Sequence, residues 1–324
     1  MTLSFGIVGC GVVADSHAEA ILALDGAKLH SAASHTPARA EAFAAKYGIR
    51  ACTYEEMLAD SEVDAVCICT PSGCHAQQAI AALEAGKHVV LEKPMAITTA
   101  EAEQICQAVE KTGQFLTVIC QMRFSEDVRR LKELVDTRAL GKLIFCELSM
   151  KYWREPAYYS ESNWKGTRSM DGGGALMNQG IHGIDLLLHI VGDARLLSGN
   201  ARTNFHTIEV EDTAAALLEF ENGALGTVIG STCTAPGYDQ LITLTGTNGY
   251  AVLRDGCLTE LVIDGKTLVH DTPPSSGIPE FLRHNSQIQN FIQAVYGKEP
   301  LLIDAREGLR AVRLIEQIYQ CDIL

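Results

Sequence analysis

The sequence lacks both an excess of basic residues and a long apolar segment. Its 324 residues include 26 lysines and arginines against 40 aspartates and glutamates, for a net charge of -14 at pH 7. Nucleic acids and anionic membranes attract basic surfaces, so this balance argues against either as a partner. No apolar run approaches the roughly 20 residues of a membrane-spanning helix, and the N-terminus lacks a signal-peptide pattern. We expect a cytoplasmic protein that acts on a small molecule.

Cysteine is plentiful, but the paired spacing of a metal site is missing. The 11 cysteines are scattered from Cys10 onward. Cysteines of this kind behave as small apolar residues in a reducing compartment. We expect no disulfide and no bound metal. The hydrophobic content of 47% and the chain length suffice for two domains with large cores.

The beginning of the chain has the pattern of a strand, a glycine turn and a helix. Leu3–Val8 is rich in β-forming residues, and a helical segment follows from Asp15. Gly9 permits a tight turn, Gly11 lets a pyrophosphate approach the backbone, and Ala14 allows close packing of the helix on the strand. A purely structural glycine turn is the alternative. The predicted dinucleotide contacts are Gly9, Cys10, Gly11, Val12 and Val13.

The second predicted strand, at about 28–34, ends without a carboxylate. An aspartate or glutamate there would bind the ribose hydroxyls of NAD and repel the 2′-phosphate of NADP. Ser34, His35 and Arg39 can instead donate hydrogen bonds to that phosphate. The pattern leans toward NADP or toward use of both cofactors, unless the ribose is bound from elsewhere.

Strands alternate with helices through the rest of residues 1–121, which predicts a parallel sheet. Such sheets bind ligands beyond the carboxyl ends of their strands. Lys93 follows the apolar strand at 88–91, and Pro94 then ends the strand because it has no N–H. A lysine there can bind a reacting hydroxyl and stabilise negative charge, although a solvated lysine is the more common case for such a position taken alone. The candidate contacts at this edge are Glu92, Lys93 and His75, although a histidine at a helix start is more often a helix-terminal polar residue.

Residues 122–324 have a different pattern, with strands at about 142–152, 195–205, 212–220 and 224–234 and further strands to Val269. Asparagine-glycine and aspartate-glycine pairs predict hairpins between them. The predicted fold is therefore α/β: an N-terminal Rossmann domain (1–121) with a parallel sheet, and a C-terminal α+β domain (122–324) with a large, mostly antiparallel open sheet. Two helices, at 279–296 and 305–319, are expected to close the chain.

Two segments of the second domain carry candidate substrate contacts. The first segment, residues 151–168, is rich in aromatic and basic residues. Aromatic residues offer a sugar ring a flat apolar face, and cations can pair with a carboxylate or phosphate, although a solvated loop explains this segment equally well. In the second, Asn178, His182 and Asp185 are spaced for one face of a helix. An imidazole titrates near neutral pH, so His182 is a candidate general base that Asp185 can orient, although a histidine on such a face is usually a core or interface residue. The candidates of the first segment are Tyr152, Trp153, Arg154, Trp164, Lys165 and Arg168.

Four motifs together resemble the glucose-fructose oxidoreductase, inositol dehydrogenase and rhizopine catabolism family of NAD(P)-dependent dehydrogenases. They are the glycine turn, TPSGCH at 70–75, AGKHVVLEKP at 85–94 and GGGALMNQGIHGIDLL at 172–187. The resemblance implies that Lys93 contacts the reacting hydroxyl and the nicotinamide, and that Thr70, Pro71 and His75 line the nicotinamide pocket. It also implies that one face of the second sheet joins subunits into homodimers or homotetramers. Gln121–Phe124 resembles the family's crossover segment, which makes Arg123 a further substrate candidate.

Asn178 departs from the aspartate that many members of the family carry there, and asparagine cannot accept a proton. The predicted catalytic residues are Lys93 and His182, with Asn178 binding a substrate hydroxyl. The N-Q-G-I-H form resembles the branch that oxidises UDP-N-acetylglucosaminuronic acid. We expect an NAD(P)-dependent dehydrogenase of a sugar, nucleotide sugar or cyclitol. The alternatives are an NAD-dependent glycosidase of the same family and a non-catalytic dinucleotide sensor.

Overall fold

The computed structural model describes residues 2–270 and 280–321. The chain forms two compact units, the first from residues 1–121 and 278–309 and the second from residues 122–277 and 310–324. The return of residues 278–309 to the first unit differs from the sequence-based division, which placed them in the second domain. Its cause is apolar packing, because Ile288, Phe291 and Ile292 lie in the core of the first unit. Among the described helices, none is long and apolar enough to cross a membrane.

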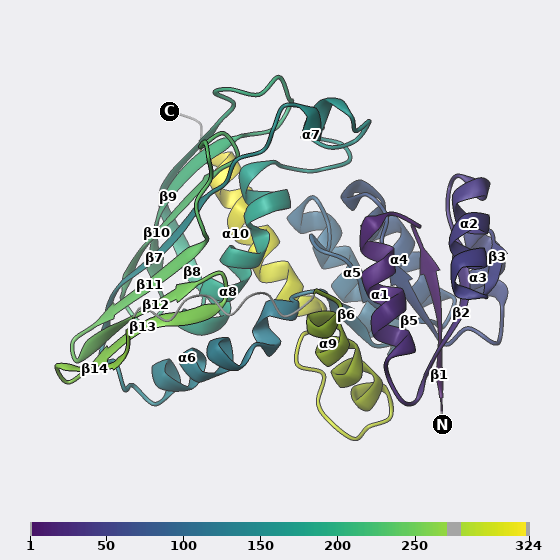
Figure 1. Ribbon diagram of the computed structural model, residues 1–324, viewed down its shortest axis with the longest axis horizontal. Helices are drawn as coiled ribbons and strands as arrows, with labels where there is room; N and C mark the ends of the chain where they lie inside the picture. The colour runs from purple at the N-terminus through teal and green to yellow at the C-terminus, as the bar shows by residue number, and fades with distance from the viewer. Residues whose placement is uncertain (1, 271–279, 322–324) are drawn as a thin grey trace. The chain divides into compact units, whose positions relative to one another are not determined.

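The first unit contains the predicted parallel sheet, with strand order β3-β2-β1-β4-β5-β6 (Figure 1). The order reverses between β1 and β4, and this is the point at which doubly wound sheets bind ligands. Strand β3, which is three residues long, was not predicted. The strands are β1 (Leu3–Val8), β2 (Ala27–Ala33), β3 (Arg50–Cys52), β4 (Ala65–Ile68), β5 (His88–Leu91) and β6 (Leu116–Val118).

Local signals account for the ends of several helices of this unit. Thr53 and Glu56 form a capping box at the start of α3, and Gly48 and Gly113 end α2 and α5 in the left-handed conformation. Helix α1 packs on α9, and α4 packs on α5. The predicted first residue of α9, Pro279, lies outside the described residues. The helices are α1 (Val12–Leu22), α2 (Pro37–Tyr47), α3 (Tyr54–Ala59), α4 (His75–Glu84), α5 (Thr99–Thr112) and α9 (Glu280–Val295).

The second unit contains an eight-stranded sheet with the order β14-β13-β12-β11-β7-β10-β9-β8. Within it, β10 pairs with β7 in parallel and the other neighbouring strands are antiparallel, which confirms the predicted fold class. The strands are β7 (Leu143–Lys151), β8 (Ala194–Arg202), β9 (Thr213–Phe220), β10 (Leu225–Ser231), β11 (Leu241–Gly246), β12 (Gly249–Arg254), β13 (Cys257–Ile263) and β14 (Lys266–Val269).

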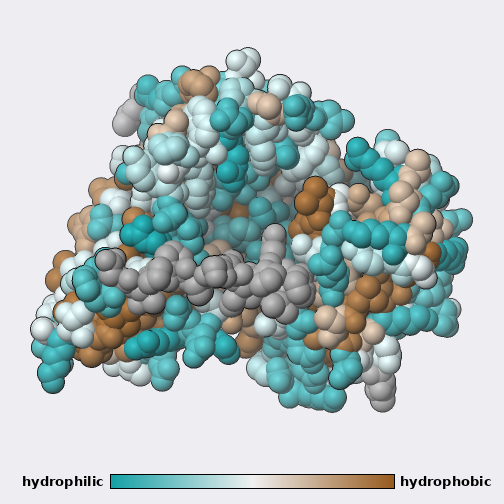
Figure 2. Space-filling model, in the orientation of Figure 1, coloured by the Kyte–Doolittle hydropathy of each residue, from teal (hydrophilic) through white to brown (hydrophobic). Residues whose placement is uncertain are grey.

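The two faces of this sheet differ in exposure. Helix α8 packs on β7 and α6 packs on β13, and α8 and α10 lie on one side of the sheet in Figure 1. The other face exposes Leu197, Leu217 and Ile229 at 38–39%, and apolar residues appear in Figure 2 along the edge where these strands lie. The helices of the unit are α6 (Glu126–Asp136), α7 (Ala157–Ser160) and α8 (Ile181–Val191), together with α10 (Ala305–Gln320) from Arg310 onward.

The asparagine-glycine and aspartate-glycine pairs predicted to form hairpin turns lie at 222–223, 248–249, 255–256 and 264–265, and two of the four have the backbone of a type I′ turn. The pairs Asp255-Gly256 and Asp264-Gly265 have positive φ at both residues, as a type I′ turn requires. At 222–223 only the glycine has positive φ. At Gly249 the glycine serves a close approach instead, since a Cβ there would lie 1.9 Å from the carbonyl oxygen of Val262.

Candidate active site

The loop after β1 has the shape that a dinucleotide pyrophosphate requires. Gly9 has φ +94, and a Cβ there would lie 2.6 Å from the carbonyl carbon of Cys69. Gly11 is the N-cap of α1 without a side-chain cap, and a Cβ on it would meet nothing within 4 Å. Ala14 is fully buried, so the helix packs closely on the strand, as predicted. The first turn of α1 therefore offers N–H groups beside open space, and the residues present fit the pyrophosphate.

The charge beside this loop is compensated within the unit. The Asp15 carboxylate accepts hydrogen bonds from Lys46 Nζ at 2.8 Å and Tyr47 Oη at 2.7 Å. Burial favours the protonated form of Asp15, but these hydrogen bonds outweigh it and lower the pKa. Burial and the Asp15 charge raise the pKa of the Cys10 thiol to about 11, so Cys10 stays a neutral thiol in the loop.

The loop after β2 lies at the surface. Ser34 Oγ accepts the N–H of Thr36 at 3.3 Å, and the side chains of His35 and Arg39 are exposed. The segment 34–39 has no acidic residue. The predicted donors to a 2′-phosphate thus stay available to solvent, and the preference for NADP stays a prediction.

His75 connects the ends of β4 and β5. Its ring nitrogens lie 2.9 Å from the carbonyl oxygen of Thr70 and 2.7 Å from that of Pro94. The residue is only 1% exposed, and burial lowers its pKa despite these two carbonyls. The hydroxyl of Thr70 donates to Gln78 Oε1 at 2.6 Å. His75 therefore links the loops after β4 and β5 through its two ring nitrogens. The sequence had suggested a contact with the cofactor.

Lys93 follows β5 and precedes a cis peptide bond to Pro94. The residue is partly buried, and its backbone N–H donates to Glu92 Oε2 at 3.2 Å. Glu92 is 6% exposed, and its other carboxylate oxygen lies 2.8 Å from His17 Nε2. Glu92 therefore has partners inside the unit, which does not support the contact with the cofactor predicted for it.

In the second unit, the segment that carries Asn178 begins as a π-helix. Residues Ala175–Gly180 form this wider turn, and α8 follows from Ile181. The prediction of one continuous α-helical face was therefore wrong for Asn178. Glu211 provides the reason, because its carboxylate accepts the N–H groups of Gly174 at 2.9 Å and Leu176 at 2.8 Å and holds the segment's start. Such turns are frequent at functional sites.

Arg123 and Asp185 form a buried ion pair. Arg123 Nε donates to Asp185 Oδ2 at 2.9 Å and its Nη2 donates to Oδ1 at 2.6 Å. Both side chains are 5% exposed. The sequence had suggested Arg123 as a substrate contact and Asp185 as the partner that orients His182. The structure instead gives both carboxylate oxygens of Asp185 to Arg123.

Two cations lie on the ring of Tyr158. Lys165 Nζ is 3.7 Å and Arg154 Cζ is 5.6 Å from the ring centroid. Arg154 also donates to Gln179 Oε1 through Nε at 2.9 Å and Nη2 at 2.6 Å. Gln179 in turn donates to Asn178 Oδ1 at 3.0 Å. One network within the second unit thus contains Tyr158, Lys165, Arg154, Gln179 and Asn178.

Burial and the nearby Arg154 charge disfavour the charged form of Lys165, and its pKa is lowered. Throughout the described part of the chain, neither Lys165 nor Arg154 forms an ion pair with a carboxylate. Asp171 attracts Lys165 from further away, and its carboxylate accepts hydrogen bonds from Asn178 Nδ2 and from the Gly166 N–H at 2.7 Å. Asp171 attracts Lys165 without forming an ion pair with it, so both cations keep hydrogen-bond donors for a further anionic group.

The other predicted substrate residues have separate surroundings. The Tyr152 hydroxyl donates to Gln240 Oε1 at 3.2 Å, and Trp164 is half-buried. Arg168 is exposed, and its Nε donates to the carbonyl oxygen of Glu209 at 3.0 Å. Trp153 packs on Phe205, with ring centroids 5.4 Å apart.

Phe205 is an aromatic neighbour that the sequence analysis missed. It is 56% exposed and comes from the loop after β8, about 50 residues from Trp153 in the chain. In the sequence, only the adjacent His206 could have drawn attention to it. Together, Phe205 and Trp153 form a partly exposed apolar surface.

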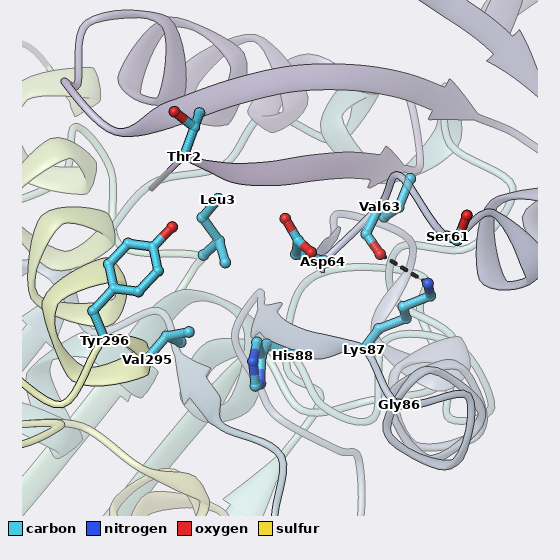
Figure 3. Close-up of a pocket in the computed structure, with 10 residues that line it drawn as sticks. All are labelled: Thr2, Leu3, Ser61, Val63, Asp64, Gly86, Lys87, His88, Val295 and Tyr296. Carbon is cyan, nitrogen blue, oxygen red and sulfur yellow. Dashed lines mark hydrogen bonds between the residues drawn. The ribbon is translucent and has the colours of Figure 1, made fainter.

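A hollow of about 530 Å³ lies at the opposite edge of the parallel sheet, where strands begin (Figure 3). Its two charged side chains with opposite sign, Lys87 and Asp64, have partners within the unit. Lys87 Nζ donates to the carbonyl oxygens of Asp60 at 2.7 Å and Val63 at 2.8 Å, and Asp64 accepts the N–H of Ser4 at 2.9 Å. Its place and its engaged groups argue against a role in the chemistry.

The sequence matches two family descriptions. Residues 3–120 match an oxidoreductase family with an NAD-binding Rossmann fold, GFO_IDH_MocA, and residues 128–252 match the GFO/IDH/MocA C-terminal domain. The chain belongs to the GFO/IDH/MocA family. It is an NAD(P)-dependent oxidoreductase that acts on CH–OH groups, and its cofactor is NAD or NADP. This confirms the resemblance seen in the sequence.

Relatives of similar length occur among characterised and solved proteins. The chain is 27% identical to the D-glucoside 3-dehydrogenase of Escherichia coli, covering 98% of this chain and 95% of the relative. It is 25% identical to the myo-inositol 2-dehydrogenase of Thermotoga maritima, covering 96% and 94%. The WlbA dehydrogenase of Bordetella pertussis, solved with NADH and UDP-GlcNAcA, is 29% identical with a TM-score of 0.90, covering 99% and 97%.

Proposed function

We propose that this GFO/IDH/MocA enzyme oxidises a secondary hydroxyl of an anionic sugar, in particular a nucleotide sugar acid resembling UDP-N-acetylglucosaminuronate. The observation that carries this proposal is the pair of cations on Tyr158. Lys165 and Arg154 lie on one ring, without a carboxylate partner, in a network that reaches Asn178. The likeness to the WlbA dehydrogenase, solved with a UDP-sugar acid, supports it further.

A negatively charged substrate would relieve the mutual repulsion of these cations. Arg154 presents a planar group that can bind a carboxylate through two hydrogen bonds, and Lys165 adds a compact charge. A neutral cyclitol offers no such compensation. The cation pair therefore favours a sugar acid over the neutral sugars and cyclitols that the sequence left open.

The proposed chemistry assigns one role to the cofactor and one to each of three side chains. NAD or NADP supplies the hydride acceptor when bound. Lys93 would donate a hydrogen bond to the reacting oxygen and stabilise its negative charge. His182 would take the hydroxyl proton, since an imidazole titrates near neutral pH. Asn178 would bind a neighbouring hydroxyl, because its amide cannot accept the proton.

Reduced-cofactor formation tests the proposal. The purified enzyme is given NAD or NADP with UDP-sugar acids, the matching neutral UDP-sugars, simple aldoses and myo-inositol. We expect turnover on a sugar acid, which Lys93→Met abolishes while binding of the reduced cofactor persists. Turnover on neutral substrates alone would contradict the anionic substrate class, and unchanged turnover by Lys93→Met would contradict the role of the lysine.

The cation pair has its own test. Arg154→Met and Lys165→Met should each raise KM for the sugar acid about tenfold or more, since a hydrogen bond to a charged group contributes about 1.5–3 kcal/mol. Lys151→Met removes a nearby charge from the end of β7 and serves as the matched control. Equal KM values for all three variants would refute the proposal. Glycoside cleavage without net redox change would instead favour the glycosidase alternative.

We also propose that the exposed face of the second sheet joins two or four copies of the chain in the cytoplasm. Leu197, Leu217 and Ile229 are exposed on this face, and burying apolar surface drives association. Light scattering after size-exclusion chromatography should give a dimer or tetramer that Leu217→Lys with Ile229→Lys dissociates. A monomeric wild-type protein would contradict this.

A further inference from the structure

Three ionisable side chains meet in the interior of the first unit. His17 lies on α1, Glu92 follows β5, and His284 lies on α9. Glu92 Oε1 is 2.8 Å from His17 Nε2 and 3.5 Å from His284 Nε2. The two imidazole rings lie edge to face with centroids 5.1 Å apart. The side chains of His17, Glu92 and His284 are 0%, 8% and 1% exposed, so water solvates the carboxylate very little.

The histidines keep this buried carboxylate ionised. Burial alone would raise the pKa of Glu92, but the hydrogen bond with His17 and the close contact with His284 outweigh it and place the pKa well below the ordinary value. A buried carboxylate requires such partners, because removal of one leaves a charge with inadequate compensation. The three residues therefore act as a unit, called the His-Glu-His cluster below.

The cluster is connected to Lys93 through the backbone. The second oxygen of Glu92, Oε2, accepts the N–H of Lys93 at 3.2 Å. His17 lies in α1, the helix that starts at the dinucleotide loop. One carboxylate thus links the cofactor helix, α9 and the residue proposed to contact the reacting oxygen.

We propose that His17, Glu92 and His284 are positioning residues that fix the backbone of Lys93 relative to the dinucleotide loop. The inference rests on the proposed function, because it gives the cluster a role through Lys93. Within the first unit, a shift of Lys93 would misplace its amino group relative to the loop, and a misplacement of about 1 Å can reduce turnover about 10²-fold.

A metal ion is the competing explanation for the cluster. The three ligand atoms lie within 4.8 Å of one another. Ligands of tetrahedral zinc at 2.0–2.1 Å lie about 3.3 Å apart. The 2.8 Å separation of His17 Nε2 and Glu92 Oε1 is instead a hydrogen-bond distance. The geometry thus favours direct hydrogen bonding, and stoichiometric metal in the purified enzyme, measured by mass spectrometry, would overturn the proposal.

Two variants of His17 separate positioning from simple folding. His17→Gln keeps an N–H donor near the place of Nε2, whereas His17→Leu removes it. We expect His17→Leu to lower kcat about 10²-fold, with KM and the affinity for reduced cofactor near their wild-type values, and we expect His17→Gln to recover most of kcat. Equal kcat in all three proteins would overturn the proposal.

Hydrogen–deuterium exchange gives a readout that does not need turnover. In the protein without cofactor, His17→Leu should accelerate exchange of the backbone amides at 92–93 about tenfold or more. The matched control is His88→Leu at the other end of β5, where His88 Nδ1 accepts the N–H of Phe115 at 3.1 Å. His88→Leu should leave kcat and exchange at 92–93 unchanged. Unaltered exchange in His17→Leu would refute the proposal.

An apolar replacement of the whole cluster completes the test. His17→Leu, Glu92→Met and His284→Leu together remove the buried charge with its partners, and such replacements preserve folding in other proteins. We expect a folded protein with kcat still about 10²-fold low; recovery of kcat would show that the cluster only stabilises the fold. If Lys93→Met retains turnover, the proposed role of Lys93 fails, and the cluster proposal, which acts through Lys93, fails with it. If Lys93→Met is inactive and His17→Leu is fully active, only the cluster proposal fails.

Discussion

The buried Arg123–Asp185 pair predicts a large loss of stability when one partner is removed. Arg123→Met leaves the Asp185 carboxylate 5% exposed, without the donors that now lie at 2.6 and 2.9 Å. Removing one partner of a buried ion pair costs about 3–5 kcal/mol. An exposed pair contributes at most about 1 kcal/mol. Lys111 and Glu84, with side chains 73% and 51% exposed, form such a pair, and Lys111→Met is the control.

Urea unfolding at pH 7, followed by tryptophan fluorescence, measures this loss. Both tryptophans of the chain, Trp153 and Trp164, lie in the second unit together with the ion pair. The double variant Arg123→Met with Asp185→Leu removes both charges and should recover most of the stability lost in the single variant. A loss below about 1 kcal/mol in Arg123→Met, as for an exposed pair, would refute the reasoning.

The same variants decide whether Arg123 also binds substrate. If its role is the ion pair alone, the double variant should have a KM close to that of the wild-type enzyme. A KM that stays high after the stability has returned would restore the sequence-based assignment of Arg123 to the substrate.

Two further predictions concern the cofactor loop and acid stability. Gly9→Ala should destabilise the first unit, because its Cβ would lie 2.6 Å from Cys69 and φ is +94. Gly11→Ala should instead unfold at nearly the wild-type temperature but bind NADH more weakly, as measured by titration calorimetry. Wild-type affinity for NADH in Gly11→Ala would contradict the pyrophosphate site. Burial favours protonation of Asp212, but hydrogen bonds from the N–H groups of residues 204–206 outweigh it and lower the pKa of Asp212 in the folded protein. The ionised Asp212 therefore stabilises the fold fully at a pH above its unfolded-state pKa of 3.8, and this stabilisation is lost as the pH falls through the lower folded-state pKa. The difference in unfolding free energy between wild type and Asp212→Asn should therefore shrink below pH 4, and a difference that grows there would contradict it.

The fold was largely predictable because its signals are local. Strands β4 and β5 are short apolar runs, and the glycines at 48 and 113 end helices within a few residues of the pattern that predicts them. Strand β3 has only three residues, none of them fully buried, so no run marks it. The place of α9 depends on packing against α1, some 270 residues earlier in the chain, which a local pattern cannot contain.

The sequence predicted which residues lie at the candidate site but not which residues each of them contacts. The motif at 92–94 places a glutamate and a lysine together at one sheet edge, and the sequence analysis assigned both to the cofactor. Successive side chains of an extended chain point to opposite sides, so two neighbours seldom contact one ligand equally. Glu92 accordingly has its partner His17 in the interior of the unit, while Lys93 is partly exposed.

Asn178 shows the same limit in a helix. Its spacing of four residues from His182 is correct for an α-helix, but the carboxylate of Glu211 holds the N–H groups of Gly174 and Leu176 and the segment adopts the wider turn. Glu211 lies more than 30 residues away in the chain, so the spacing alone could not reveal this. A motif therefore identifies which residues can do the chemistry, whereas residues distant in sequence decide which way each one points. For this enzyme, the variants most informative about mechanism include those at such distant partners, His17 and His284 above all.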